Sequence, residues 1–181
     1  MNKLVLIAIF FGLLVRVEPD IFIWTIDKHQ LKISDFKAKP PKKKTKEKAM
    51  SFVGIIYDYK TKSDSCTINI YAVFDRTQSW LKDKSFLGHE QGHFDVSEIS
   101  ARQFRKTMTE LNGKINKKSI KKALETINDS IQKIDYENQS TYQLSCESGT
   151  LQSYLNKMVV DKLQALDTYK NNQVKILLKT E

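Results

Sequence analysis

Two neighbouring segments of the chain have the alternating pattern of β-strands. Along residues 66–74 the apolar side chains of one face stand at every second position, at Ile68, Ile70, Ala72 and Phe74. Residues 52–59 are rich in β-branched and aromatic side chains, and the polar segment 60–65 joins the two. This pattern predicts an antiparallel hairpin, which needs a helix to cover one of its faces.

Three later segments have helical periodicity. The first is expected to begin at Asp83 or Ser85, either of which can cap it, and to end at Asn112-Gly113. The second extends from about residue 119 to 138 and the third from about 151 to 169, each with an apolar stripe. The chain therefore predicts an α+β fold, in which a small antiparallel hairpin or sheet packs on the first helix and two further helices follow.

Two weaker patterns flank these elements. Residues 31–36 alternate only in part, which fits a short strand or an extended segment. Residues 174–178 fit either a last short strand or a disordered end.

Length and composition fit one globular domain behind a targeting segment. The chain has 181 residues, 40% of them hydrophobic and 28% charged. A twelve-residue apolar run from Leu4 to Val15 follows Lys3, which is typical of a signal peptide and too short to span a bilayer. We therefore expect a signal peptide at 1–18, or an uncleaved anchor that would be the only membrane contact, and a single domain at 19–181. Export would place that domain outside the cell, in the periplasm or in the cell envelope.

Charge and cysteine content add two expectations. The net charge is +9, and seven lysines lie between Lys37 and Lys48. No aromatic residues alternate with these lysines, so we expect no nucleic-acid partner. The lysine run is interpreted either as a solvated loop or as a surface that binds anionic polysaccharide. In an exported protein Cys66 and Cys146 form either a disulfide or two separate buried thiols.

The first predicted helix contains the sequence His89-Glu90-Gln91-Gly92-His93, an H-E-x-x-H motif. Residues four apart lie on the same helix face, so both imidazoles can bind one Zn²⁺ ion. Glu90 projects beside that ion, where its carboxylate can act as general base toward a water molecule. The competing interpretation is a pair of core histidines, because the same helix face carries apolar residues.

A catalytic zinc ion usually has a third protein ligand. Ile99 occupies the position at which the metzincin pattern requires one, which excludes that class. On the second helix Asp135 lies near the apolar stripe and is the preferred candidate, with the upstream His29 as an alternative.

The remaining candidates have supporting roles. Asp95 and Glu98 point away from the metal face, so we expect them to contact the metal ligands from behind or to take part in helix packing. Glu98 is expected to pair with Arg102, four residues later. Tyr136 and Tyr142 are candidates for stabilising an oxyanion.

The run from His89 to Arg102, HEQGHFDVSEISAR, resembles the signature of a bacterial family of predicted secreted zinc-dependent proteases, domain of unknown function 922. Leu31-Lys-Ile-Ser-Asp-Phe-Lys37 resembles the start of that domain, and Ser79-Trp80 a Ser-Trp before its zinc helix. Members commonly carry Y-D-x-x-T-x-H downstream. Here Asp135 matches, whereas Asn138 and Ser140 stand where Thr and His are usual.

The motif and the resemblance together predict a secreted metallopeptidase of zincin-like α+β fold with one Zn²⁺ ion, acting on a peptide or protein substrate. An extended substrate is expected to pair with strand 66–74. The alternative is a zinc-binding or interaction module of the cell envelope that has lost catalysis. The sequence leaves the oligomeric state open.

Overall fold

The computed structural model describes residues 20–42, 46–147 and 152–179. Its strands are β1 (Ile21–Ile23), β2 (Ala49–Met50), β3 (Val53–Thr61), β4 (Ser65–Asp75), β5 (Trp80–Leu81) and β6 (Gln173–Leu177). Its α-helices are α1 (Leu87–Glu110), α2 (Ile120–Glu147) and α3 (Gln152–Ala165). Single 3₁₀ turns lie at Ile33–Asp35, Lys84–Phe86 and Asp167–Tyr169. Residues 1–18, where a signal peptide or an anchor is expected, lie outside the described residues.

Strand β4 is the centre of the main sheet. It pairs antiparallel with β3 along one edge, and with β1 and β6 along the other. The β3–β4 hairpin confirms the strands expected from the alternating pattern, with Thr61 opposite Cys66 at the turn. Because both edges of β4 are already paired, the expected addition of a substrate strand to residues 66–74 is wrong.

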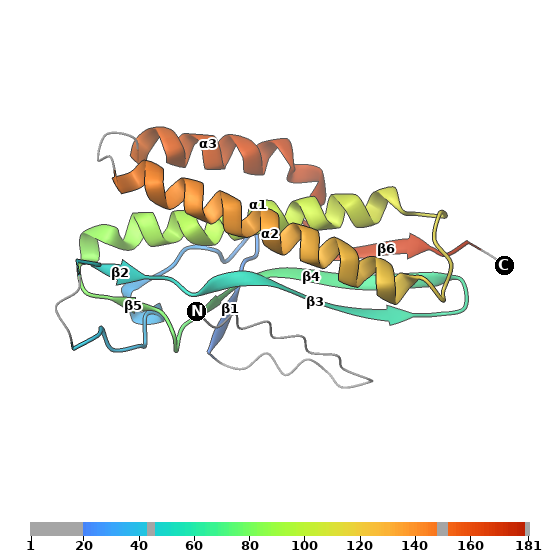
Figure 1. Cartoon of the computed structure of the whole chain (residues 1–181), viewed down its shortest axis with the longest axis horizontal. Helices are drawn as coiled ribbons and strands as arrows, with labels where there is room; N and C mark the ends of the chain where they lie inside the picture. The colour runs from blue at the N-terminus through green and yellow to red at the C-terminus, as the bar shows by residue number, and fades with distance from the viewer. Residues whose placement is uncertain (1–19, 43–45, 148–151, 180–181) are drawn as a thin grey trace.

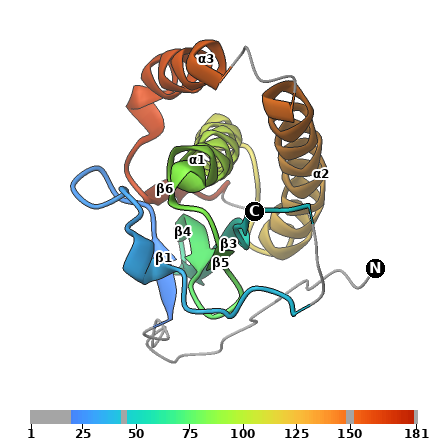
Figure 2. The ribbon, with the colours of Figure 1, turned by 90° about the vertical axis from the view of Figure 1, so that its left-hand side faces the viewer.

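Helix α1 lies on this sheet and is enclosed by the two other helices. Figure 2 shows α1 nearly end-on, with the sheet below it, α3 above it and α2 on its right. Phe94, Ala101 and Phe104 of α1 join the core with the buried side chains of β4. Residues 96–102 are all buried, which requires cover on every side of the helix. The α+β class and the covering helix are therefore confirmed.

The three helices alternate in direction. Helix α1 runs from left to right in Figure 1, α2 returns, and α3 runs from left to right again. The start of α1, the end of α2 and the start of α3 consequently meet at one end of the molecule. No helix in the described ranges has the length and apolar content needed to cross a bilayer.

Several segment boundaries differ from the sequence-based expectation. Residues 31–36 contain a 3₁₀ turn, because the Asp35 carboxylate accepts a hydrogen bond from the backbone N–H of Lys32 at 2.7 Å. Residues 173–177 form β6, which β4 holds in register. Helix α2 continues nine residues past the expected end at 138.

Of the two alternatives for the cysteines, the structure excludes the disulfide. Cys66 is a free thiol with no exposed surface, and burial raises its pKa to about 11. It lies at the turn end of the hairpin, opposite Ile176, whereas Cys146 belongs to the last turn of α2 at the other end of the molecule. A disulfide requires Cα atoms within about 7 Å, so the two ends of the fold keep these residues apart. The side chain of Cys146 lies outside the described residues.

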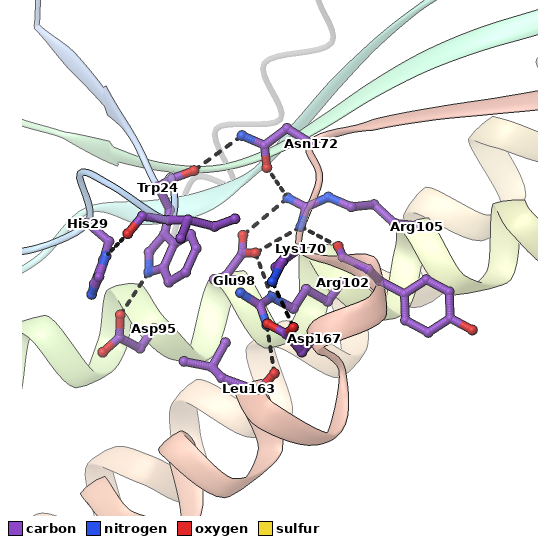
Figure 3. A network of polar contacts seen from close by, with 12 residues as sticks. Trp24, His29, Asp95, Glu98, Arg102, Arg105, Leu163, Asp167, Lys170 and Asn172 are labelled. Carbon is purple, nitrogen blue, oxygen red and sulfur yellow. Dashed lines mark hydrogen bonds and ion pairs between the residues drawn. The ribbon is translucent and has the colours of Figure 1, made fainter.

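A buried ionic network joins α1 to the segments around it (Figure 3). The Glu98 carboxylate accepts hydrogen bonds from Arg102 Nε at 2.9 Å and from Arg105 Nη1 at 2.8 Å. Arg105 also donates to the Ile70 carbonyl of β4, and to the Asn172 side chain that precedes β6. The i,i+4 pairing of Glu98 with Arg102 is confirmed, and Arg105 connects the same carboxylate with the sheet.

Candidate functional site

His89 and His93 lie where the ends of the three helices meet. The Asp83 side chain accepts a hydrogen bond from the backbone N–H of Ser85. This bond caps a 3₁₀ turn that leads directly into α1. The motif is therefore helical, and its two imidazoles lie on one face with ring centroids 4.7 Å apart. Their Nε2 atoms are 3.1 Å apart. Both rings are half-buried against α2 and α3, so they do not enter the sheet-facing core that the competing interpretation required.

The proton of His93 is placed by Gln139 of α2. Gln139 Nε2 donates to the backbone carbonyl of His93 and to the Ser97 hydroxyl, both at 3.0 Å. This turns Gln139 Oε1 toward His93 Nδ1, at 2.6 Å. Because an amide oxygen only accepts, Nδ1 of His93 carries the proton and Nε2 a lone pair. Burial lowers the pKa of His93, which favours this neutral ring.

Gln152, the first residue of α3, orients His89 in the same way. Its Nε2 donates to the Tyr142 hydroxyl and to Asn156 Oδ1, both at 2.7 Å. Its Oε1 therefore faces His89 Nδ1, at 3.3 Å. The proton of neutral His89 then lies on Nδ1, and its Nε2 lone pair points toward that of His93. Such hydrogen bonds to the other ring nitrogen are typical of metal-binding histidines.

A third acceptor atom faces the two imidazoles. Gln143 Oε1, from the next turn of α2 after Gln139, lies 3.1 Å from His89 Nε2 and 3.0 Å from His93 Nε2. His89, Gln143 and Gln152 also line a cavity of about 380 Å³. His89 therefore borders an open space large enough for part of a ligand.

Tyr142 packs against both imidazoles. Its ring stacks on His89 with centroids 5.4 Å apart and meets His93 edge-on at 4.9 Å. Its hydroxyl accepts from Gln152 and donates to Asn156 Oδ1 at 3.2 Å. Since Tyr142 is only 3% exposed and its hydroxyl is already bonded there, the structure gives it a packing role in place of the oxyanion role expected from sequence.

Gly92 leaves the space that the Tyr142 ring occupies. A Cβ atom on Gly92 would lie 1.8 Å from the Tyr142 hydroxyl oxygen and 2.3 Å from Cζ. We expect Gly92→Ala to displace the ring, to lower the free energy of unfolding by about 1–3 kcal/mol and to weaken metal binding. Chemical denaturation measures the change in the free energy of unfolding. The matched control is Gly88→Ala in the same helix, where a Cβ meets nothing within 4 Å and no loss is expected. Equal stability of the two variants would contradict the prediction.

Glu90 lies in the first turn of α1, between the two histidines in sequence. Its side chain is 3% exposed, although carboxylates are seldom buried in proteins. Its charge acts on His93 and favours the protonated form of that imidazole, against the larger effect of burial. Glu90 is thus a buried carboxylate beside the histidine pair, as the motif requires.

Asp135 lies one turn of α2 away from the histidine pair. Its Oδ2 accepts a hydrogen bond from Ser97 Oγ at 3.3 Å, and burial raises its pKa. Across the described parts of the chain, no three His, Cys, Asp or Glu side chains are grouped closely enough to hold one metal ion. Asp135 therefore does not join His89 and His93 in this structure.

In the part of the chain that the structure describes, no hydrogen bond or ring contact joins the other expected site residues to His89 or His93. Asp95 accepts hydrogen bonds from Trp24 Nε1 and Gln91 Nε2, both at 2.9 Å, and burial raises its pKa. The His29 ring stacks on Trp24 at 4.7 Å, which removes it as the alternative third ligand. Tyr136 is 68% exposed. Asp95 fits its expected role in helix packing.

Glu98, expected beside the metal ligands or in helix packing, bonds to arginines and not to either histidine. Its place in the buried ionic network makes it a packing residue of α1.

Three glutamines in the site were not anticipated from the sequence. Gln139, Gln143 and Gln152 all touch a histidine of the motif. The spacing of Asp135, Gln139 and Gln143 by four residues was the available signal, because it places all three on one face of α2.

Comparisons with known proteins give no match: no protein-family model, no curated protein and no solved structure corresponds to this chain. The resemblance to secreted zinc-dependent proteases therefore stays a prediction, and the site has to be interpreted from its own geometry.

Proposed function

We propose that the protein is a secreted zinc-dependent peptidase in which His89 and His93 hold the metal and Glu90 is the general base. The observation that carries this proposal is the convergence of the two Nε2 lone pairs at 3.1 Å, with both Nδ1 protons engaged elsewhere. Neutral imidazoles oriented in this way are the usual donors to zinc.

The residues of the site suit hydrolysis of a peptide bond. When bound, zinc would polarise the scissile carbonyl and make a neighbouring water more acidic. Glu90 would take the proton of the attacking water and pass it to the leaving amine. The cavity beside His89 and Gln143 would admit the substrate, and Gln139 and Gln152 would keep the imidazoles in register throughout.

A second function, a zinc-binding or interaction module without turnover, is favoured by one observation. The side chains that contact the two histidines from α2 and α3 are amides and a hydrogen-bonded tyrosine, with no second acid grouped beside them among the described residues. Structural zinc sites need no general base, so Glu90 is the residue that separates the two functions.

Elemental analysis of the purified protein tests the metal site. We expect close to one zinc ion per chain in the wild type and loss of that zinc in His93→Ala, because the variant removes one of two imidazole donors. His29→Ala is the matched control and should keep its zinc, since His29 packs on Trp24 away from the site. A folded wild-type protein that takes up no zinc when zinc is supplied would overturn the proposal.

A further inference from the structure

Three acceptor atoms converge at the end of α1. His89 Nε2, His93 Nε2 and Gln143 Oε1 form a nearly equilateral triangle with edges of 3.1, 3.1 and 3.0 Å. Tetrahedral zinc, with bonds of roughly 2.0–2.1 Å to nitrogen or oxygen, separates its ligand atoms by about 3.3 Å. The triangle therefore has nearly the dimensions of one face of a zinc coordination sphere.

Hydrogen bonds cannot satisfy all three contacts. The protons of both neutral imidazoles are on Nδ1, facing Gln152 and Gln139, so three lone pairs point at one another. A proton added to one Nε2 can be shared between the two contacts of that nitrogen. The contact between the other Nε2 and Gln143 Oε1 then still brings two lone pairs together. Protons on both nitrogens place two N–H groups head to head. A cation in front of the triangle is attractive to all three atoms at once.

We propose that Gln143 supplies the third protein ligand of the zinc ion through its carboxamide oxygen. This inference depends on the proposed zinc site at His89 and His93, and it replaces Asp135 as third ligand. It makes the site unusual in charge, because two imidazoles and an amide are all neutral and leave the full double charge on the metal.

The register of α2 against α1 explains why Gln143 has this position. The helices are antiparallel, so each four-residue step along α2 meets a residue one turn earlier in α1 (Figure 1). Asp135 meets Ser97, Gln139 meets His93, and Gln143 meets both histidines. Asp135 would have to move by eight residues of helix, about 12 Å, to take the place of Gln143.

The neutral ligand has a consequence for the chemistry of the site. A carboxylate at this position would offset one of the metal's two positive charges, whereas an amide oxygen offers only a dipole. The site would then hold zinc less tightly than a site with two histidines and one carboxylate. The zinc ion would keep more of its positive charge for polarising a carbonyl or a water. Glu90 remains the nearby carboxylate that is available for proton transfer.

Zinc affinity, measured by competition with a chromophoric chelator on the whole chain, tests the inference without an activity assay. Mutation of residues that hydrogen-bond to zinc ligands typically weakens zinc binding about 10–100-fold. Loss of a ligand itself in Gln143→Leu should therefore lower the zinc affinity by more than about 100-fold. Gln143→Glu should bind zinc at least about tenfold more tightly than the wild type, because it adds a charge at the metal. Asp135→Asn is the matched control on the same face of α2 and should change affinity by less than about threefold.

Substitution of Co²⁺ for zinc gives a second readout. A change from amide to carboxylate alters the ligand field, so the visible absorption bands of the Gln143→Glu protein should shift while those of Asp135→Asn stay in place. Unchanged affinity and unchanged bands in both Gln143 variants would overturn the ligand role of Gln143 and leave the two-histidine site standing. A large loss in Asp135→Asn, with Gln143→Leu unaffected, would also overturn it. Absence of zinc binding in the wild type would overturn both the inference and the proposed function.

Discussion

Glu90→Gln is expected to lower the rate of peptide hydrolysis by about 10²–10⁴-fold while leaving zinc content unchanged. The substitution keeps the size of the side chain and removes its capacity to accept a proton. Because the neighbouring imidazoles are oriented by Gln139 and Gln152, the metal ligands do not depend on the Glu90 charge for their geometry. Loss of rate without loss of metal is therefore specific to a general base.

The measurement for Glu90 combines two assays on the same preparation. Cleavage of a fluorescence-quenched peptide library gives the rate, and elemental analysis gives the zinc content. Glu110→Gln, an exposed glutamate in the last turn of α1, is the matched control and should cleave as the wild type does. Equal rates for Glu90→Gln and wild type would contradict the role of Glu90. A zinc-loaded wild type that cleaves nothing would instead favour the non-catalytic module.

Glu98→Ala is expected to lower the free energy of unfolding by about 3–5 kcal/mol, the largest effect on stability that we predict. Glu98 and Arg105 have no exposed side-chain surface, and Arg102 is 4% exposed. Removing the carboxylate takes the buried counter-charge from both guanidinium groups and leaves Arg102 only the exposed Asp167 carboxylate, 4.0 Å away. Arg105 would retain its bonds to the Ile70 carbonyl and to Asn172, which offset only part of that cost.

Urea denaturation of the metal-free protein measures this effect, since zinc binding would otherwise add to the apparent stability. Glu125→Ala is the matched control: Glu125 pairs with Lys121 at 3.9 Å, with both side chains more than half exposed. Such a pair contributes at most about 0.5 kcal/mol. A loss below 1 kcal/mol for Glu98→Ala would show that the network does not hold α1 to the sheet.

Most of the fold could be predicted from local patterns. Alternation predicted the β3–β4 hairpin, because a strand at a sheet surface exposes every second side chain to the core. Asp83 and Gly113 predicted both ends of α1: Asp83 caps the turn that precedes the helix, and Gly113 adopts a positive φ of 70° after it. The i,i+4 rule likewise predicted the bond between Glu98 and Arg102. These are interactions between residues that are near in sequence.

Several of the expectations that failed involve residues that are distant in sequence. The choice of Asp135 rested on its face of α2, which was correct, but the face does not specify how far α2 slides along α1. The proposal that Tyr142 stabilises an oxyanion did not take into account that its ring fills the space above Gly92. Of the two alternatives for the cysteines, the disulfide is excluded because Cys66 and the end of α2 lie at opposite ends of the fold.

The sequence by itself determined that two histidines and a glutamate share one end of a helix, because the spacing of a helical motif sets the direction of its side chains. Only the tertiary structure decided that amides surround them. Gln139, Gln143 and Gln152 reach the histidines through the packing of α2 and α3 on α1, 46 to 63 residues away along the chain. An amide carries no charge, so its role depends on the atoms that packing places in front of it.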